Sequence, residues 1–353
     1  MITSGGQAGI TALWALRSPC PLACEYCYFG SLEEHRENPV TAPGALSHLS
    51  HDDLPSGDVL AFARTIAGSA VQRVFLAGGE PLVWPPILSL IEILRRGGVE
   101  VVVCTNGIPL NRPEITRSLV ELEVDAVSVS LDSLDARYHD TWRPSRNGKD
   151  GWQQVVDGIR TLVTTRGSAT APRVGIYMVL TRSNLTSLAA TGRFAADLGC
   201  DYFVPQPVSL DADHRLHSEL TLVEGDLPAL GQQFTALANA RLPLWTPAVD
   251  YPGRIAAAVR TSVGSVRDCF GGQRLFFVQP DGSVWDCPSS LRIAATPPSR
   301  HRTIRGNTAA EVFTADDSCA DCALFSVDCV NMWPLMDFDR VLSTTAGLCR
   351  DRA

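Results

Sequence analysis

The feature that most constrains the fold is a regular alternation of strand-like and helix-like segments between residues 57 and 240. Val99–Cys104 is a continuous apolar run of the kind that is buried on both faces in a parallel sheet. Gly57–Ala67 has its apolar residues at helical spacing, which predicts an amphipathic helix. With the apolar run Ile10–Leu16, the pattern gives about six β/α units, fewer than the eight that close a barrel.

The other predicted elements continue this alternation. Strands are expected at Arg73–Leu76, Asp125–Leu131, Val174–Leu180 and Asp201–Pro205. Helices are expected at Pro86–Arg96, Pro113–Glu121, Gly151–Thr165, Asn184–Leu198 and Leu222–Ala240. Asn184 is the expected N-cap of its helix. The alternation stops in 246–267, where Pro, Gly and small residues dominate. We therefore predict a partial barrel over residues 1–245 and a small cysteine-rich domain over residues 246–353.

Three cysteines stand close together after the first apolar run, in the stretch Cys20-Pro21-Leu22-Ala23-Cys24-Glu25-Tyr26-Cys27. Thiolates are soft ligands that suit iron–sulfur clusters, and three of them occupy three corners of a cube. The fourth iron would then be open to bind a substrate or cofactor. A structural zinc knuckle is the alternative, although zinc sites usually pair two short C-x2-C steps.

This stretch resembles the signature of the radical S-adenosylmethionine (SAM) superfamily, including the aromatic Tyr26 before the third cysteine. The resemblance implies a partial (β/α)6 TIM-like barrel and a [4Fe–4S] cluster held by Cys20, Cys24 and Cys27. It also implies that the open iron binds SAM, which is cleaved reductively to a 5'-deoxyadenosyl radical. That radical then abstracts hydrogen from a C–H bond of the substrate.

Further stretches at predicted strand ends agree with the resemblance, and barrel active sites are built there. Gly78-Gly79-Glu80-Pro81 matches the family stretch that contacts the SAM amino group. Asn106, Ser130 and Asp132 occupy positions that hold the ribose and methionine parts, and Arg143 is expected to pair with the SAM carboxylate. Each has an ordinary structural alternative, as a turn, a strand-end cap or a solvated side chain. The expected cofactor-binding residues are Tyr26, Gly78, Gly79, Glu80, Pro81, Asn106, Ser130, Asp132 and Arg143.

Three side chains are candidates for catalysis. His214 and His217 stand in a polar segment after the sixth strand, where either could take a proton from substrate. Cys104 ends the third strand and could donate a hydrogen atom. The alternatives are idle surface histidines and a buried cysteine that behaves as a small hydrophobe. Gln206, at the end of the sixth strand, is expected to face the substrate.

Cysteines become frequent again near the C-terminus. Cys269 and Cys287 bracket a predicted hairpin whose turn is Pro280-Asp281-Gly282-Ser283. This region resembles the auxiliary-cluster extension called SPASM, or its shorter relative called twitch. It departs from the full pattern because Cys329 comes one residue late and Trp333 stands where a further cysteine is expected.

The resemblance leaves two ligand assignments open. In the first, one auxiliary cluster is held by Cys269, Cys287, Cys319 and Cys322. In the second, Cys319, Cys322, Cys329 and Cys349 hold one cluster, while Cys269 and Cys287 hold another with an outside ligand. We expect at least one auxiliary [4Fe–4S] cluster, and a zinc ribbon built from the same cysteines is the alternative.

Composition narrows the class of partner. The net charge is −8 and no basic stripe is visible, which argues against nucleic acid as the main partner. No apolar run reaches the roughly 18 residues that a membrane span needs, and no signal peptide is visible. The 11 cysteines of a chain this long suit metal ligation better than disulfides. We expect a cytoplasmic enzyme with an external electron donor such as flavodoxin or ferredoxin.

The substrate is open between two classes. Compact length, the Cys269–Cys287 spacing and the lack of an added domain before Ile10 favour redox tailoring of a small natural product, such as an aminosugar or nucleoside. That step would be a dehydrogenation, epimerisation or decarboxylation. The six C-terminal cysteines favour the alternative, a maturase that crosslinks or oxidises a ribosomally made peptide. A non-catalytic iron–sulfur scaffold would have no need of the SAM-contact stretches.

Overall fold

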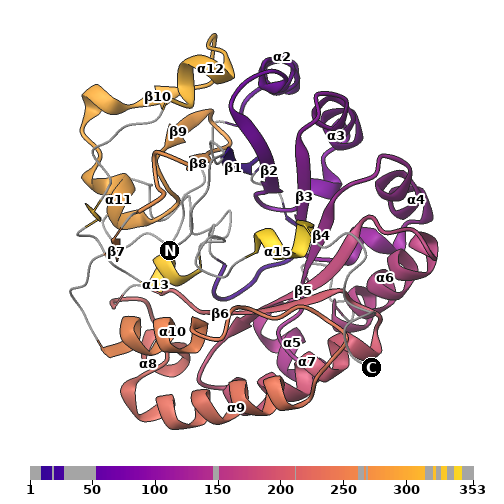
Figure 1. The fold of residues 1–353 in the computed structure, drawn as a ribbon, viewed down its shortest axis with the longest axis vertical. Helices are drawn as coiled ribbons and strands as arrows, with labels where there is room; N and C mark the ends of the chain where they lie inside the picture. Colours follow the sequence, from indigo (N-terminus) through magenta and orange to yellow (C-terminus); the bar gives the residue numbers. More distant parts are fainter. Residues whose placement is uncertain are drawn as a thin grey trace.

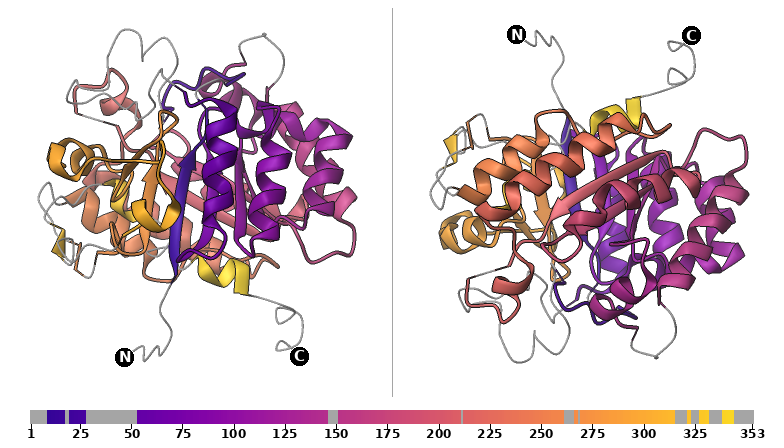
Figure 2. Two further views of the ribbon diagram at one scale, coloured as in Figure 1. Left: turned by 90° about the horizontal axis from the view of Figure 1, so that it is seen from above. Right: turned by 90° about the horizontal axis from the view of Figure 1, so that it is seen from below.

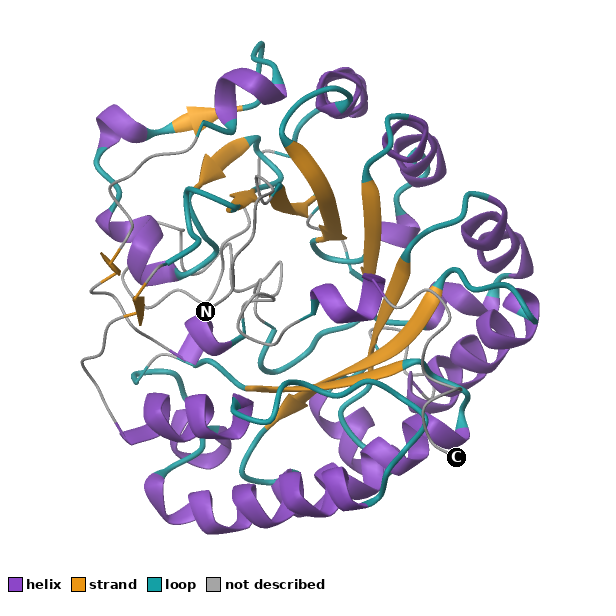
Figure 3. Cartoon of the chain, in the orientation of Figure 1, coloured by secondary structure: helices purple, strands orange, loops and turns teal. Residues whose placement is uncertain are grey.

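The structure, a computed structural model, describes residues 9–17, 20–27, 53–145, 151–210, 212–260, 266–267, 269–314, 321–322, 327–331 and 338–343. A curved sheet lies inside a ring of helices (Figures 1 and 3). Within the described residues its strands follow the order β10-β9-β8-β1-β2-β3-β4-β5-β6. The six parallel strands of the expected partial barrel are β1 (Ile10–Ala15), β2 (Val71–Ala77), β3 (Glu100–Thr105), β4 (Ala126–Ser130), β5 (Arg173–Leu180) and β6 (Tyr202–Pro207).

Helices on the outer face connect these strands (Figure 1). They are α2 (Ser56–Ile66), α3 (Ile87–Arg96), α4 (Pro113–Glu121), α5 (Ala136–Trp142), α6 (Gly151–Arg166) and α7 (Leu188–Asp197). In α3 the buried residues are Ile87, Leu90, Ile91 and Leu94, the i, i+3, i+4, i+7 spacing of one helix face. The sheet face beneath is equally apolar, since Val101, Val102 and Val103 are all fully buried. Burial on both faces explains why β3 is a continuous apolar run.

The chain after β6 forms α8 (His217–Leu220), α9 (Leu227–Asn239) and α10 (Tyr251–Arg260). It then adds strands to the barrel sheet. β8 (Leu275–Val278) pairs in parallel with β1, and β9 (Ser283–Trp285) returns antiparallel to β8 as the predicted hairpin. Gly282 makes the turn possible because its φ of 89° lies in the left-handed region. β10 (Arg302–Thr303) pairs antiparallel with β9. The C-terminal hairpin therefore continues the barrel sheet, and the division into two domains at residue 245 stays a prediction.

The remaining described elements are short. They are β7 (Val266–Arg267), α11 (Ser290–Ala295), α12 (Ala309–Val312), β11 (Asp321–Cys322), α13 (Val327–Val330) and α15 (Asp339–Ser343), with single 3-10 turns η1 (Pro81–Val83), η2 (Ile108–Asn111), η3 (Leu185–Ser187), η4 (Glu224–Asp226) and η5 (Pro298–Arg300). No helix in the described part of the chain is long and apolar enough to cross a membrane.

The segment that carries α15 fills the inside of the barrel. Phe338 is completely buried, and its ring contacts Phe75 of β2, Tyr177 of β5, Tyr202 of β6 and Trp245. α15 itself lies at the amino-terminal ends of the strands, at the lower edge of the left view in Figure 2. This segment therefore blocks the end of the open barrel where the strands begin.

The structure corrects several details of the predicted elements. The segment 246–267, expected to be a boundary of Pro, Gly and small residues, contains α10. α9 begins at Leu227 rather than Leu222, because the Asp226 carboxylate accepts a hydrogen bond from the Val223 N–H and holds a 3-10 turn there. The Asn184 side chain makes no cap hydrogen bond. Instead its Oδ1 accepts the Thr181 N–H, and its Nδ2 donates to the carbonyls of Asp132 and Val179 at the ends of two neighbouring strands.

Candidate active site

A cavity of about 270 Å³ opens at the carboxyl ends of the parallel strands. Its wall includes the three cysteines of the loop after β1, the ends of β2 to β6, and two segments from the C-terminal part of the chain. Cys20, Cys24 and Cys27 line one part of it, and Pro288 and Asn331 also line it. Carboxyl ends of parallel strands are where barrel enzymes place their active sites, so the cavity lies where the chemistry was expected.

The three-cysteine loop is held by the chain that follows α5. The Ala23 N–H donates to the Pro144 carbonyl at 2.9 Å, and the Glu25 N–H donates to the Trp142 carbonyl at 3.0 Å. Leu22 forms a β-bridge with Ser145. The cysteine loop has no regular structure of its own. Residues 142–145 bond to its backbone as a neighbouring strand would, and so fix its position over the cavity.

The donor set of the loop fits an iron–sulfur cluster. Burial raises the pKa of the Cys20 thiol to about 12 and also raises the pKa of Cys24, so neither thiolate is favoured without a bound cation. Each sulfur nevertheless faces a donor: Asn106 Nδ2 lies 3.6 Å from Cys20 Sγ, and Arg143 Nη1 lies 3.7 Å from Cys24 Sγ. Donors of this kind stabilise an anionic sulfur.

The number and type of the ligands also fit a cluster. Among the described residues, no three His, Cys, Asp or Glu side chains converge on a site for a single metal ion. A cube does not require such convergence, because each thiolate binds a different iron. Three thiols in one short loop fit three corners of a cluster, whereas a structural zinc ion needs a fourth ligand.

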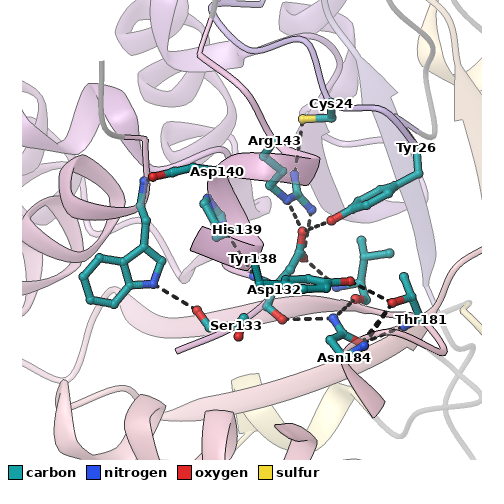
Figure 4. Close-up of polar contacts among 12 residues, drawn as sticks. Cys24, Tyr26, Asp132, Ser133, Tyr138, His139, Asp140, Arg143, Thr181 and Asn184 are labelled. Carbon is teal, nitrogen blue, oxygen red and sulfur yellow. Dashed lines mark hydrogen bonds and ion pairs between the residues drawn. The ribbon is translucent and has the colours of Figure 1, made fainter. Parts of the chain in front are cut away.

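Behind the loop lies a buried network centred on Asp132 (Figure 4). The Tyr26 hydroxyl and Arg143 Nε both donate to Asp132 Oδ2, and Arg143 Nη2 donates to Oδ1 at 3.1 Å. Burial alone would raise the pKa of Asp132, but the charge and hydrogen bonds of Arg143 hold it below its usual value. Burial lowers the pKa of His139 to about 4, so its neutral ring accepts the Asp132 N–H at 3.4 Å.

The Gly78–Pro81 turn packs against the segment that leads into the cysteine loop. The Gly79 N–H donates to the Arg17 carbonyl at 2.6 Å, and a Cβ on Gly78 would lie only 2.7 Å from the same oxygen. Gly78 also has a φ of 128°, so this position requires glycine. Both glycines line the cavity.

Glu80 is fully buried and does not line the cavity. Its carboxylate accepts hydrogen bonds from the Leu82 N–H, the Thr105 hydroxyl and the Asn106 N–H. Burial raises its pKa to about 7, while these donors lower it. In the structure Glu80 therefore ties the β2 turn to the end of β3. Its contact with the SAM amino group, and that of the buried Pro81, stay predictions.

Other expected side chains fall into two groups. Asn106, Ser130, Tyr26, Arg143 and Cys104 line the cavity. Burial raises the pKa of Cys104 to about 12, with a further rise from Glu80, so it is a neutral thiol near pH 7. His214 and His217 do not line the cavity. His214 Nδ1 accepts the Leu216 N–H at 3.2 Å, and His217 begins α8, so their catalytic role stays a prediction.

The expected auxiliary cysteines are described in part. Cys269 Sγ and Cys287 Cβ lie 3.6 and 3.4 Å from where a Cβ on Gly271 would be, so these two cysteines flank one glycine. β7 and β11 pair antiparallel, with Val266 opposite Cys322. Cys329 lies in α13. Cys319, Cys349 and the side chain of Cys322 lie outside the described residues.

The sequence did not single out the wall formed by Asn331 and Pro288. Asn331 Nδ2 donates to the Pro207 carbonyl at 3.1 Å, and Gln206 Nε2 donates to the Asn331 carbonyl at 3.0 Å. These bonds attach the segment of α13 to β6, the last strand of the sheet. Nothing in the sequence links these residues, which are more than a hundred positions apart. Gln206 was expected at the cavity, and it lines it.

Comparison with known proteins agrees with this geometry. A model of the family described as Radical SAM superfamily matches residues 19–195. That range covers half of the chain and contains the three-cysteine loop, the glycine turn and Asp132. The chain belongs to the radical SAM superfamily. Enzymes of this superfamily use a [4Fe–4S] cluster and SAM, so the protein is a radical SAM enzyme with these cofactors.

Individual relatives differ in how much of the chain they match. The mycofactocin maturase MftC of Mycobacterium ulcerans is 25% identical over 300 residues, covering 81% of this chain and 70% of that protein. The AdoMet-dependent heme synthase of Methanosarcina barkeri is 28% identical over 187 residues, covering 53% of this chain and 47% of that protein. The chain thus spans only part of the length of these relatives. Streptococcus suis SuiB, bound to precursor peptide SuiA, has a TM-score of 0.60 at 13% identity over 89% of this chain and 66% of that one, which shows a shared fold.

Proposed function

We propose that this radical SAM enzyme abstracts hydrogen from an unactivated C–H bond of a peptide and leaves the peptide oxidised or crosslinked. The observation that carries the proposal is the composition of the cavity wall. One part carries Cys20, Cys24 and Cys27, and another carries Pro288 and Asn331. Pro288 follows Cys287 directly, and Asn331 stands two residues after Cys329. A group bound between them would be close to both sets of cysteines.

The cysteine side of the cavity is suited to hold SAM. When bound, a [4Fe–4S] cluster on Cys20, Cys24 and Cys27 supplies the electron that cleaves SAM. Arg143 offers the only guanidinium that lines the described cavity, and it can pair with the SAM carboxylate. The ring of Tyr26 and the hydroxyl of Ser130 lie on the same wall and can contact the nucleoside. Apolar side chains such as Leu13 and Val179 exclude water there.

An oxidation also needs an acceptor for the electron that the substrate radical gives up. We assign this role to an auxiliary [4Fe–4S] cluster that the C-terminal cysteines would hold. The pairing of β7 with β11 brings the backbone of Cys322 beside the strand that leads to Cys269, and Cys269 lies near Cys287. This geometry supports the ligand set Cys269, Cys287, Cys319 and Cys322. Cys329 and Cys349 remain available for a second set. An external donor such as flavodoxin or ferredoxin would reduce the first cluster.

Two observations support a peptide substrate. The match to the mycofactocin maturase extends over 81% of the chain, whereas the match to the heme synthase covers 53%. A match over 81% of the chain extends past residue 245, into the predicted cysteine-rich domain. SuiB, which shares the fold, has been crystallised with a precursor peptide. An extended chain could present one side chain to the cavity and keep the rest outside.

A small natural product, such as an aminosugar or nucleoside, is the second candidate. The cavity volume of about 270 Å³ is compatible with it, although it lies just below the roughly 300–1,000 Å³ of pockets for drug-sized ligands. Bound SAM would leave room for only a small group. The same volume suits a single peptide side chain, so this observation does not by itself separate the two classes.

The formation of 5'-deoxyadenosine, which requires hydrogen transfer from the substrate to the 5'-deoxyadenosyl radical, distinguishes the two classes of substrate. The reconstituted enzyme would be incubated anaerobically with SAM, dithionite and either a panel of candidate precursor peptides from neighbouring genes or a panel of nucleosides and aminosugars. We expect one of the peptides to stimulate 5'-deoxyadenosine and to lose two hydrogens by mass spectrometry. Stimulation by a nucleoside or aminosugar alone would support the second candidate and contradict the first.

A further inference from the structure

Asp132 has an unusual position relative to the cavity. It is completely buried and is not among the residues that line the cavity. Three of its hydrogen-bond partners, Tyr26, Arg143 and Val179, do line it, and Tyr26 and Arg143 bond to it through their side chains. Figure 4 shows the carboxylate between the Arg143 guanidinium and the Tyr26 hydroxyl, with Cys24 on the other side of the guanidinium. This arrangement therefore gives Asp132 no direct contact with SAM bound in the cavity.

The hydrogen bonds of the carboxylate support the same conclusion. Oδ2 accepts from the Tyr26 hydroxyl and from Arg143 Nε. Oδ1 accepts from Arg143 Nη2 at 3.1 Å and from the Val179 N–H at 2.8 Å. A carboxylate offers about four lone-pair sites, and all four are used. No acceptor capacity is left for a ligand.

The partners of Asp132 are the groups that a ligand would meet. The two bonds from Nε and Nη2 form a bidentate pair, which fixes the plane of the Arg143 guanidinium. With that plane fixed, Nη1 lies 3.7 Å from Cys24 Sγ. The bond from the Tyr26 hydroxyl fixes the ring orientation two residues further along the same loop. One carboxylate thus orients both side chains.

Asp132 is itself held in place by its backbone. Its N–H donates to His139 Nδ1 at 3.4 Å, and its carbonyl accepts from Asn184 Nδ2 at 3.0 Å. Asn184 also binds the end of β5, where the Val179 N–H meets the carboxylate. The carboxylate therefore connects the cysteine loop, the Arg143 segment and the end of β5.

We propose that Asp132 is a positioning residue which holds the ring of Tyr26 and the guanidinium of Arg143 in the orientation that binds SAM. It acts through these two side chains and contacts neither SAM nor the cluster. The proposal rests on the proposed function only in taking the cavity as the SAM site. It assigns Asp132 a different role from the direct cofactor contact that the sequence suggested.

The test compares Asp132→Asn with a matched control, Asp201→Asn. Asp201 also accepts a hydrogen bond from an arginine, Arg166, and from an N–H of β5, that of Val174 at 2.7 Å. It lies at the other end of β5, away from the cavity. The SAM dissociation constant of the reconstituted holoenzyme would be measured by calorimetry, and the reduced cluster by electron paramagnetic resonance with and without SAM.

We expect Asp132→Asn to weaken SAM binding by about tenfold or more, the usual effect of losing hydrogen bonds to a charged group. The spectral change that SAM causes should also shrink. Asp201→Asn should lower the melting temperature and leave both SAM readouts unchanged. Wild-type SAM affinity in Asp132→Asn, or an equal loss in Asp201→Asn, would overturn the proposal.

Two further variants cover the case in which Asp132→Asn does not fold. Tyr26→Phe keeps the ring and the ion pair and removes only the bond to Asp132, so SAM binding should weaken severalfold. Arg143→Lys keeps the charge and loses the bidentate pair. In the double variant with Asp132→Asn, the loss of SAM affinity should be smaller than the sum of the two single losses, because both substitutions disrupt the same bidentate pair. Wild-type affinity in Tyr26→Phe, or additive losses in the double variant, would contradict a positioning role.

These measurements are independent of catalysis. Wild-type enzyme that binds SAM but oxidises neither a peptide nor a small molecule would count against the proposed function. The comparison between Asp132→Asn and Asp201→Asn would still decide the role of Asp132.

Discussion

Replacing Phe338 with alanine tests whether the C-terminal segment fills the barrel. Phe338 is completely buried, and its ring centroid lies 5.5 Å from those of Phe75 and Tyr202. The centroids of Trp245 and Tyr177 lie 6.0 and 6.2 Å away. Truncating a buried phenylalanine costs about 3–5 kcal/mol, and the cost is larger where neighbours cannot collapse into the space. Four large rings anchored on separate parts of the barrel leave little room for collapse. We expect a loss of about 4 kcal/mol in the free energy of unfolding.

Urea denaturation of the anaerobic holoenzyme, followed by far-ultraviolet circular dichroism, would measure this loss. Two variants serve as controls. Phe338→Leu keeps most of the apolar volume and should cost less than about 1.5 kcal/mol. Asp339→Asn removes an ion pair whose carboxylate is 73% exposed, so it should cost less than about 1 kcal/mol. The reasoning is wrong if Phe338→Ala costs no more than Asp339→Asn.

Three other variants test separate parts of the site. Because burial raises the pKa of Glu80 from 4.5 to about 7, the native state binds its proton more tightly than the unfolded state. The stability that this proton contributes is fully present below pH 4.5 and is lost as the pH rises through 7. Between pH 5 and 8 the free energy of unfolding of the wild type should fall by about 3 kcal/mol more than that of Glu80→Gln, as measured by urea denaturation of both proteins. Gly78→Ala should destabilise the fold by about 2 kcal/mol and weaken SAM binding, whereas Gly68→Ala, at a positive φ with nothing within 4 Å, should affect stability alone. Asn331→Ala should raise the KM of the substrate about tenfold and leave the SAM dissociation constant unchanged; a change in SAM affinity instead would contradict its place on the substrate side.

Most of the barrel was predictable because its elements are periodic. The apolar residues of α3 recur at helical spacing, and β3 is apolar throughout, so each pattern specifies one kind of element. The cysteine spacing likewise identified the loop and its chemistry. These features depend on residues that are close in sequence, so the spacing of the residues directly reflects the burial or ligation that causes it.

The arrangement of the site was less predictable because its contacts are long-range. Tyr26 and Asp132 are 106 positions apart, and no local pattern shows that the four acceptor sites of Asp132 are filled by its neighbours. Glu80 stands in a Gly-Gly-Glu-Pro stretch that is typical of an exposed turn, yet its carboxylate accepts a hydrogen bond from the Asn106 N–H at the end of β3. Phe338 and Asn331 belong to no periodic pattern of the sequence, so nothing in it places them inside the barrel and on the cavity wall.

The central claim is that the loop Cys20–Cys27 holds a cluster that cleaves SAM in the cavity behind it. It is tested most directly by measuring 5'-deoxyadenosine after anaerobic reconstitution with iron and sulfide and addition of SAM and dithionite. The wild-type enzyme should form 5'-deoxyadenosine, and a variant with Cys20, Cys24 and Cys27 all replaced by alanine should form none while losing about four irons per chain. An iron-loaded wild-type enzyme that forms no 5'-deoxyadenosine, or a triple variant that forms as much as the wild type, would contradict the claim.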